Sequence, residues 1–113
     1  MKLEVGMYVR TKYNGIFNIQ VLEAIRDINC NYIEINYIRF PRNEILKASH
    51  NIIDLIEVGD YVNGCLVERK FPEVEYAEQS IKLKGSTDYF YDIHIKSIVT
   101  KEQFESISYK VGE

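Results

Sequence analysis

The stretch LEVGMYVR at residues 3–10 returns in the middle of the chain as IEVGDYVN at residues 56–63. Five of the eight positions are identical, and Leu3 and Ile56 form a conservative sixth pair. A second echo joins SHNIIDLI at residues 49–56 to TKEQFESI at residues 100–107, at a separation of 51 residues against 53 for the first. The pattern indicates two copies of one module of about fifty residues.

Within each copy, alternating apolar residues and many Tyr, Phe, Ile and Val favour strands. The Asn-Gly pairs at 14–15 and 63–64 predict hairpin turns. Gly6 and Gly59 occupy the same repeat position, and we expect a positive φ or a tight strand entry at both. The predicted strands are 7–12, 16–25, 32–37, 44–47, 61–62, 65–71, 76–84 and 89–95, with 40–43 predicted to be a loop or edge because of Pro41.

A short helical turn is predicted near the end of each copy. Ser49 and Thr100 are candidate N-caps, and Gln103 stands where a capping box places its reach-back side chain. A closing strand is predicted at 108–111, and the last strand of the first copy is predicted to be the start of the second.

We therefore expect a mostly β protein made of two tandem small SH3-like barrel repeats, residues 1–55 and 56–113, each with one short helical turn. A module of about fifty residues is only marginally stable alone, because it buries little of its surface. We expect the two copies to pack together as one unit or the chain to form a homo-oligomer.

Charge is unevenly distributed between the copies. Residues 1–55 carry seven Lys and Arg against six Asp and Glu, whereas residues 56–113 carry seven against eleven, which together give the net charge of −3. An acidic protein is repelled by the phosphate backbone, so direct nucleic-acid binding is not expected. A basic protein surface is a better partner for the second copy.

The sequence offers little for catalysis. Cys30 and Cys65 are isolated and predicted to be small buried residues. His50 and His94 have no metal-ligand spacing with Cys, Asp or Glu, and His94 is predicted to be an exposed member of the 89–95 strand. The glycines at 59 and 64 do not have the spacing of a phosphate loop. We expect no enzyme, no metal and no cofactor.

Three groups of residues are candidate binding sites. The first is an acidic patch, whose alternative interpretation is a solvated edge that discourages aggregation. The second is a pair of interface tyrosines, which the other repeat could equally cover. The third is a basic-aromatic group that could hold a phosphate and stack a base, or be an ordinary charged loop. The acidic patch comprises Glu73, Glu75, Glu78, Asp88 and Asp92, and the interface tyrosines are Tyr89 and Tyr91. The basic-aromatic group comprises Arg39, Arg42 and Tyr13, with Arg10 and Lys12 nearby.

Two segments, residues 47–64 and 95–106, resemble small uncharacterised accessory proteins of clostridial phages and prophages that carry an internal repeat. The resemblance implies a genomic setting and no catalytic or binding residues. Small phage accessory proteins are often inhibitors of host defence, such as anti-CRISPR proteins, or sponges for nucleotide signals.

The leading hypothesis is a non-enzymatic phage protein, cytoplasmic in the host cell, that inhibits a host defence protein through protein–protein contact. The alternatives are an oligomeric sponge for a signalling nucleotide and a nucleic-acid-associated or virion structural module. No apolar run approaches the roughly twenty residues of a membrane span, so we expect no membrane association.

Overall fold

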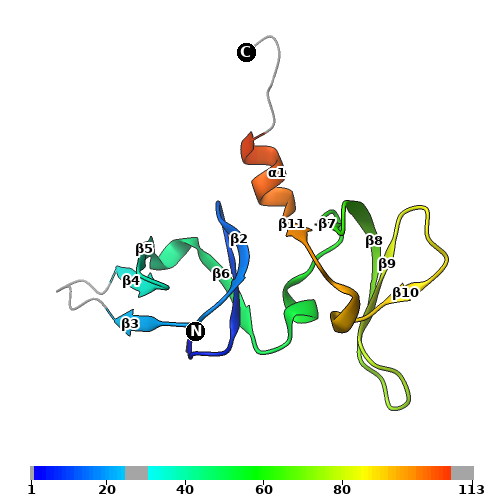
Figure 1. The fold of residues 1–113 in the computed structure, drawn as a ribbon, viewed down its shortest axis with the longest axis horizontal. Helices are drawn as coiled ribbons and strands as arrows, with labels where there is room; N and C mark the ends of the chain where they lie inside the picture. Colours follow the sequence, from blue (N-terminus) through cyan, green and yellow to red (C-terminus); the bar gives the residue numbers. More distant parts are fainter. Residues whose placement is uncertain (1, 25–30, 108–113) are drawn as a thin grey trace, which may run out of the picture. The chain divides into compact units, whose positions relative to one another are not determined.

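The computed structural model describes residues 2–24 and 31–107 of the chain (Figure 1). The chain divides into two compact units, Met1–Leu55 and Ile56–Glu113. The boundary lies at the position where the repeated motif begins for the second time.

The first unit contains two three-stranded antiparallel sheets, ordered β2-β1-β6 and β3-β4-β5. Short 3₁₀ turns stand before and after β6. Its core is a cluster of buried apolar side chains: Val9, Ile19, Ile33, Ile35, Phe40 and Ile45. Its elements are β1 (Tyr8–Thr11), β2 (Gly15–Asn18), β3 (Leu22–Ala24), β4 (Tyr32–Ile35), β5 (Ile38–Pro41), η1 (Arg42–Glu44), β6 (Ile45–Ser49) and η2 (Ile52–Leu55).

The second unit contains one five-stranded antiparallel sheet, ordered β10-β9-β8-β7-β11, and the short helix α1 that follows it in sequence (Figure 1). Its buried apolar side chains include Ile56, Val62, Val67, Ile81 and Leu83. Its elements are β7 (Tyr61–Val62), β8 (Cys65–Phe71), β9 (Ser80–Leu83), β10 (Tyr89–Phe90), η3 (Asp92–His94), β11 (Ile98–Val99) and α1 (Lys101–Ile107).

The mostly β class predicted from the sequence is confirmed, with one short helix and three 3₁₀ turns among the described residues. Within those residues the sheets do not close into barrels. Both units begin with a hairpin and end with a 3₁₀ turn, a last strand and a helical turn. Between the hairpin and the 3₁₀ turn, the first unit has three strands, β3, β4 and β5, and the second has two, β9 and β10.

The repeated motif forms the same turn in both units. In the first unit Gly6 has φ 95°. Its N–H donates to the carbonyl of Ile19 at 2.9 Å, and the N–H of Ile19 donates to the carbonyl of Met7 at 2.7 Å. This reciprocal pair joins the start of the motif to the end of the β1–β2 hairpin, and it leaves Ile19 and Val9 fully buried.

In the second unit Gly59 has φ 99°. Its N–H donates to the carbonyl of Val67 at 3.1 Å, and the N–H of Val67 donates to the carbonyl of Asp60 at 2.8 Å. Val67 and Val62 are fully buried. The positive φ expected at both motif glycines is therefore confirmed.

A side-chain contact with the motif glutamate also recurs at equivalent positions. In the first unit His50 Nε2 lies 2.5 Å from Glu4 Oε1, and in the second Lys101 Nζ lies 3.1 Å from Glu57 Oε1. Glu4 and Glu57 are the same motif position, and His50 and Lys101 each follow the predicted cap residue. The side chain opposite the glutamate has changed, but the contact is kept.

The helix predicted after Thr100 forms with its capping box. Gln103 N–H donates to Thr100 Oγ1 at 3.2 Å, and Thr100 N–H donates to Gln103 Oε1 at 3.1 Å. The sequence did not indicate a second cap. Asp60 is fully buried, and its carboxylate accepts the N–H of Lys101 at 2.9 Å and the N–H of Glu57 at 2.7 Å.

The first cap differs in detail from the prediction. Ser49 Oγ accepts the N–H of Asn51, and Asn51 Oδ1 accepts the N–H of Ile53. Two side chains therefore cap the start of η2. The Asn63-Gly64 hairpin forms as predicted, with β7 joined to β8 and Val62 opposite Cys65.

Several strand predictions were wrong in whole or in part. The strand predicted at 16–25 is divided into β2 and β3, which belong to different sheets, and the strand predicted at 76–84 is confined to β9. The strand predicted at 89–95 ends at Phe90, and η3 follows. The edge predicted around Pro41 is confirmed: β5 is the edge strand of its sheet and ends at Pro41, where the missing N–H is not needed by a neighbour. The start of the second copy, β7, pairs with β8 and β11 of its own unit, and β6 is the last strand of the first. The closing strand at 108–111 lies outside the described residues.

Replacing Asp60 by alanine should lower the free energy of unfolding by about 2–4 kcal/mol, because two backbone N–H groups lose a buried charged acceptor. Chemical denaturation of the full chain measures this. Asp88→Ala removes a carboxylate of the same type from an exposed position and should change stability by less than about 0.5 kcal/mol. Equal effects of the two substitutions would contradict the capping role of Asp60.

Candidate binding site

An aromatic surface lies on one face of the β8-β9-β10 sheet. Ile81 and Leu83 of β9 point into the core, so Ser80 and Lys82 belong to the opposite face. On that face Phe71 stands opposite Ser80, and Tyr89 stands opposite Lys82. The Phe71 and Tyr89 rings meet edge to face across β9, with centroids 5.3 Å apart and planes at 71°.

Two hollows share Tyr89 and Tyr91, and we call them together the tyrosine groove. The first hollow has a volume of about 340 Å³, and its floor includes the small side chain of Ser80. The second has a volume of about 460 Å³. The first is lined chiefly by Phe71, Pro72, Val74, Glu78, Tyr89 and Tyr91, and the second by Asp88, Tyr89, Phe90, Tyr91 and His94.

All five residues of the predicted acidic patch are exposed, but they do not form one cluster. Glu78 lines the first hollow and Asp88 the second. Glu73 and Glu75 flank Val74 in the loop between β8 and β9, within which Val74 and Ala77 form an isolated bridge. They were expected on a strand edge, but they lie in this loop. Asp92 begins η3. The structure thus places one carboxylate at each hollow.

His94 holds the far wall of the groove. Its Nδ1 accepts the backbone N–H of Tyr91 at 3.1 Å, and its ring lies beside those of Phe90 and Tyr91, with centroids 6.2 and 5.9 Å away. His94 is exposed as predicted, but it lies in a 3₁₀ turn and not on an alternating strand. Its role is to fix the backbone at the end of β10.

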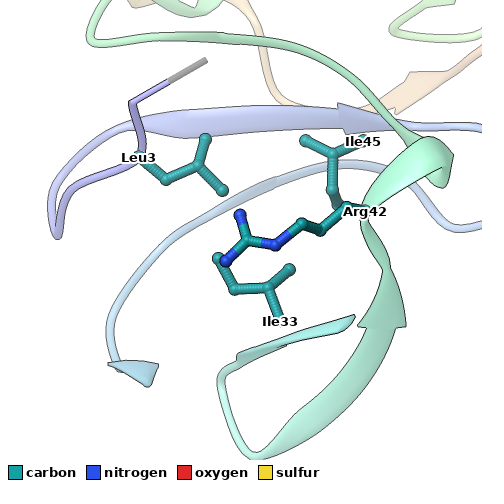
Figure 2. Close-up of a pocket in the computed structure, with 4 residues that line it drawn as sticks. All are labelled: Leu3, Ile33, Arg42 and Ile45. Carbon is teal, nitrogen blue, oxygen red and sulfur yellow. The ribbon is translucent and has the colours of Figure 1, made fainter. Parts of the chain in front are cut away.

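The basic-aromatic group is divided among different neighbours. The Arg39 guanidinium lies over the Tyr32 ring, 4.2 Å from its centroid. Figure 2 shows the Arg42 side chain reaching into a hollow of about 180 Å³ lined by Leu3, Ile33 and Ile45. Arg42 also lines a more polar hollow of about 500 Å³ with Asn31, Tyr32, Pro41 and Asn43.

Tyr13 contacts a different cation. The Lys12 ammonium lies 5.3 Å from the centroid of its ring, in the turn between β1 and β2. The sequence did not indicate Tyr32 as the aromatic partner of Arg39. The register of β4 and β5 decides it, because Glu34 stands opposite Arg39 and Tyr32 is its diagonal neighbour on the same face.

Arg10 was wrongly placed with this surface group. Its side chain is fully buried, and Nη1 donates to the carbonyl of Leu55 at 2.8 Å. The alternation of β1 puts Arg10 on the face opposite Val9, where η2 covers it. Arg10 is therefore a structural residue of the first unit.

Cys65 was predicted to be buried but is exposed, because it immediately follows the hairpin turn. Cys30 lies outside the described residues. Among the residues that the structure describes, no three His, Cys, Asp or Glu side chains gather in a way that could hold a metal ion.

The tyrosine groove and the Arg39 surface occupy equivalent faces of the two units. Both 3₁₀ turns before the last strand close with the same bond, and the strand before each carries a phenylalanine, Phe40 opposite Ile33 and Phe90 opposite Ile81. In this alignment Arg39 corresponds to Tyr89, and Arg42 corresponds to Asp92. The frame is retained, and the exposed side chains have changed from basic to aromatic and acidic.

No family model, curated protein or solved structure matches the chain. None of the helices in the described ranges is long and apolar enough to cross a membrane.

Replacing Arg10 by alanine should lower the free energy of unfolding by about 3–5 kcal/mol, since it removes a buried charged donor and leaves a cavity. Arg39→Ala, at an exposed position, should cost less than about 1 kcal/mol, in the range of a surface cation–π contact. Urea denaturation of both variants measures the difference. A loss for Arg39→Ala as large as that for Arg10→Ala would contradict the assignment.

Proposed function

We propose that the protein is a non-enzymatic binding protein of phage origin that inhibits a host defence component by protein–protein contact. The contact is made by the tyrosine groove and the acidic residues around it. The observation that carries the proposal is the combination of exposed aromatic rings, an apolar hollow and carboxylates on one face of the second unit.

The apolar exposure in this part of the chain is large. Of the residues that line the tyrosine groove, Val74 is 58% exposed and Tyr89 56%. Soluble monomers keep extended apolar patches small, and patches rimmed by polar groups often mark protein-binding sites. Tyrosine is enriched at such sites because it combines a large apolar ring with a polar tip. These features favour a protein partner over a role in turnover.

Charge supports the choice of partner. Residues 56–113 carry four more acidic than basic side chains, seven against eleven. A basic partner surface, such as the nucleic-acid channel of a defence nuclease, would be steered toward them. The resemblance to clostridial phage accessory proteins supplies the biological setting for such a target.

We also infer that each repeat is a variant of the SH3-like barrel. The order of strands supports it, with a hairpin, two or three further strands, a 3₁₀ turn and a last strand in both units. The sheets of the described residues are open, so each repeat would be an incompletely closed form. This class of fold has many roles and adds little to the functional argument.

Reversing Glu73, Glu75 and Glu78 together to lysine should weaken binding to the defence component at least tenfold, because attraction becomes repulsion on one side of the groove. The measurement is protection of a phage from the defence system in a host that expresses the protein, measured as plating efficiency. Added salt should weaken capture of the partner by the unmodified chain.

The matched control reverses three exposed glutamates outside the patch, Glu23, Glu68 and Glu105, which gives the same change in net charge. This variant should protect the phage as well as the unmodified protein does. Equal loss in both variants, or no loss in the patch variant, would remove the acidic residues from the interface.

A second candidate function, an oligomeric nucleotide sponge, is favoured by Arg39 stacked on Tyr32 beside the polar hollow that Arg42 lines. A signalling nucleotide bound there at one hundred times its Kd should stabilise the protein by about 2.7 kcal/mol. A thermal-shift screen of cyclic nucleotides measures this, and the Arg39→Ala, Arg42→Ala double variant should abolish the shift. Unchanged melting with every nucleotide would dismiss this candidate.

A further inference from the structure

The tyrosine groove has a shape that a flat partner surface would not fill. Tyr89 is more than half exposed and stands with Tyr91 between the two hollows, since both residues line both of them. A ligand that occupies both hollows must pass over or around these rings. An extended peptide does this readily, because its side chains project separately from a thin backbone.

The first hollow is suited to an apolar side chain. Three aromatic residues, a proline, a valine and an alanine line it together with Glu78 and Ser80, and Ser80 is small and 5% exposed. Phe71 and Tyr89, whose rings are in edge-to-face contact, both line this hollow. A side chain such as Leu, Phe or Pro would be removed from water there, and the burial of apolar surface favours binding.

The second hollow is suited to a cation. It is lined by three aromatic residues, Tyr89, Phe90 and Tyr91, together with Asp88 and His94. Aromatic faces attract ammonium and guanidinium groups, and a carboxylate beside them adds a charged acceptor. His94 Nδ1 accepts the backbone N–H of Tyr91, and this bond holds the backbone that carries the Tyr91 ring.

The charges around the groove agree with this assignment. Each hollow has one carboxylate, Glu78 in the first and Asp88 in the second, and among the described residues that line them there is no lysine or arginine. Lys82 lies on the same sheet face opposite Tyr89 but lines neither hollow. An anionic ligand would therefore meet two carboxylates without a compensating cation.

We propose that the tyrosine groove binds an extended peptide segment in which an apolar side chain, inserted beside Phe71, is followed or preceded closely by an arginine or lysine that enters the hollow of Asp88. The proposal rests on the proposed function and specifies the part of the partner that is recognised: a basic tail or loop, not a folded surface.

The test is fluorescence polarisation of the full chain with a small set of labelled synthetic peptides. Each peptide is a Gly/Ser decamer that contains one apolar residue, Leu, Phe or Pro, and one Arg, separated by zero, one or two residues in either order. At least one peptide should bind, and replacing its Arg by Glu or its apolar residue by Ser should weaken binding at least tenfold. Added salt should weaken it further.

Two variants and a matched control locate the site. Tyr89→Ala and Asp88→Lys should each reduce peptide affinity at least tenfold. Tyr76→Ala removes the most exposed tyrosine of the same unit, which lines neither hollow, and should leave the affinity unchanged. All three positions are exposed, and circular dichroism should show that each variant is folded.

Absence of binding by every peptide, equal binding of the Glu-containing peptides, or equal loss for Tyr76→Ala and Tyr89→Ala would overturn the proposal. These results are separate from the test of the proposed function. Phage protection that depends on the acidic residues, without any peptide binding, would retain the function and reject the peptide mode. Peptide binding without phage protection would retain the groove and reject the defence target.

Discussion

The reciprocal hydrogen-bond pair at the repeated glycine is the constraint on which each unit depends. A positive φ at Gly6 or Gly59 turns the chain so that the glycine N–H donates to the carbonyl of a buried apolar residue, Ile19 or Val67. The N–H of that residue donates in turn to the carbonyl of the residue after the glycine. Any residue with a Cβ is strained in this conformation. The second valine of the motif, Val9 or Val62, then enters the core. In each unit the last strand pairs with the first, β6 with β1 and β11 with β7.

The duplicated frame separates what the chain must keep from what it can change. Residues that close the turn and fill the core are equivalent in the two units. The contact of the motif glutamate with His50 or Lys101 is equivalent as well. The exposed face of the strand before the 3₁₀ turn, β5 or β10, is not under that constraint, so Arg39 in one unit corresponds to Tyr89 in the other. The two units thus present surfaces of different charge at corresponding positions.

Much of the local structure could be predicted because its causes are local. The Asn63-Gly64 hairpin follows from residues that tolerate positive φ, and the Thr100 capping box follows from side chains three residues apart. The predictions failed where a distant partner decided the outcome. Arg10 was assigned to the surface, yet η2 covers it, and no feature of its neighbours in sequence indicates this.

The sequence alone determined the duplication, the strand-rich class and the residues that carry charge and aromatic rings, since all three are properties of composition and spacing. Only the tertiary structure decided which of these residues share a hollow. Glu78 and Asp88 reach the tyrosine groove while Glu73, Glu75 and Asp92 line neither hollow, because the pairing of β8, β9 and β10 sets which side chains stand beside Tyr89. Strand register acts between segments distant in the chain, so the spacing of residues within one segment does not encode it.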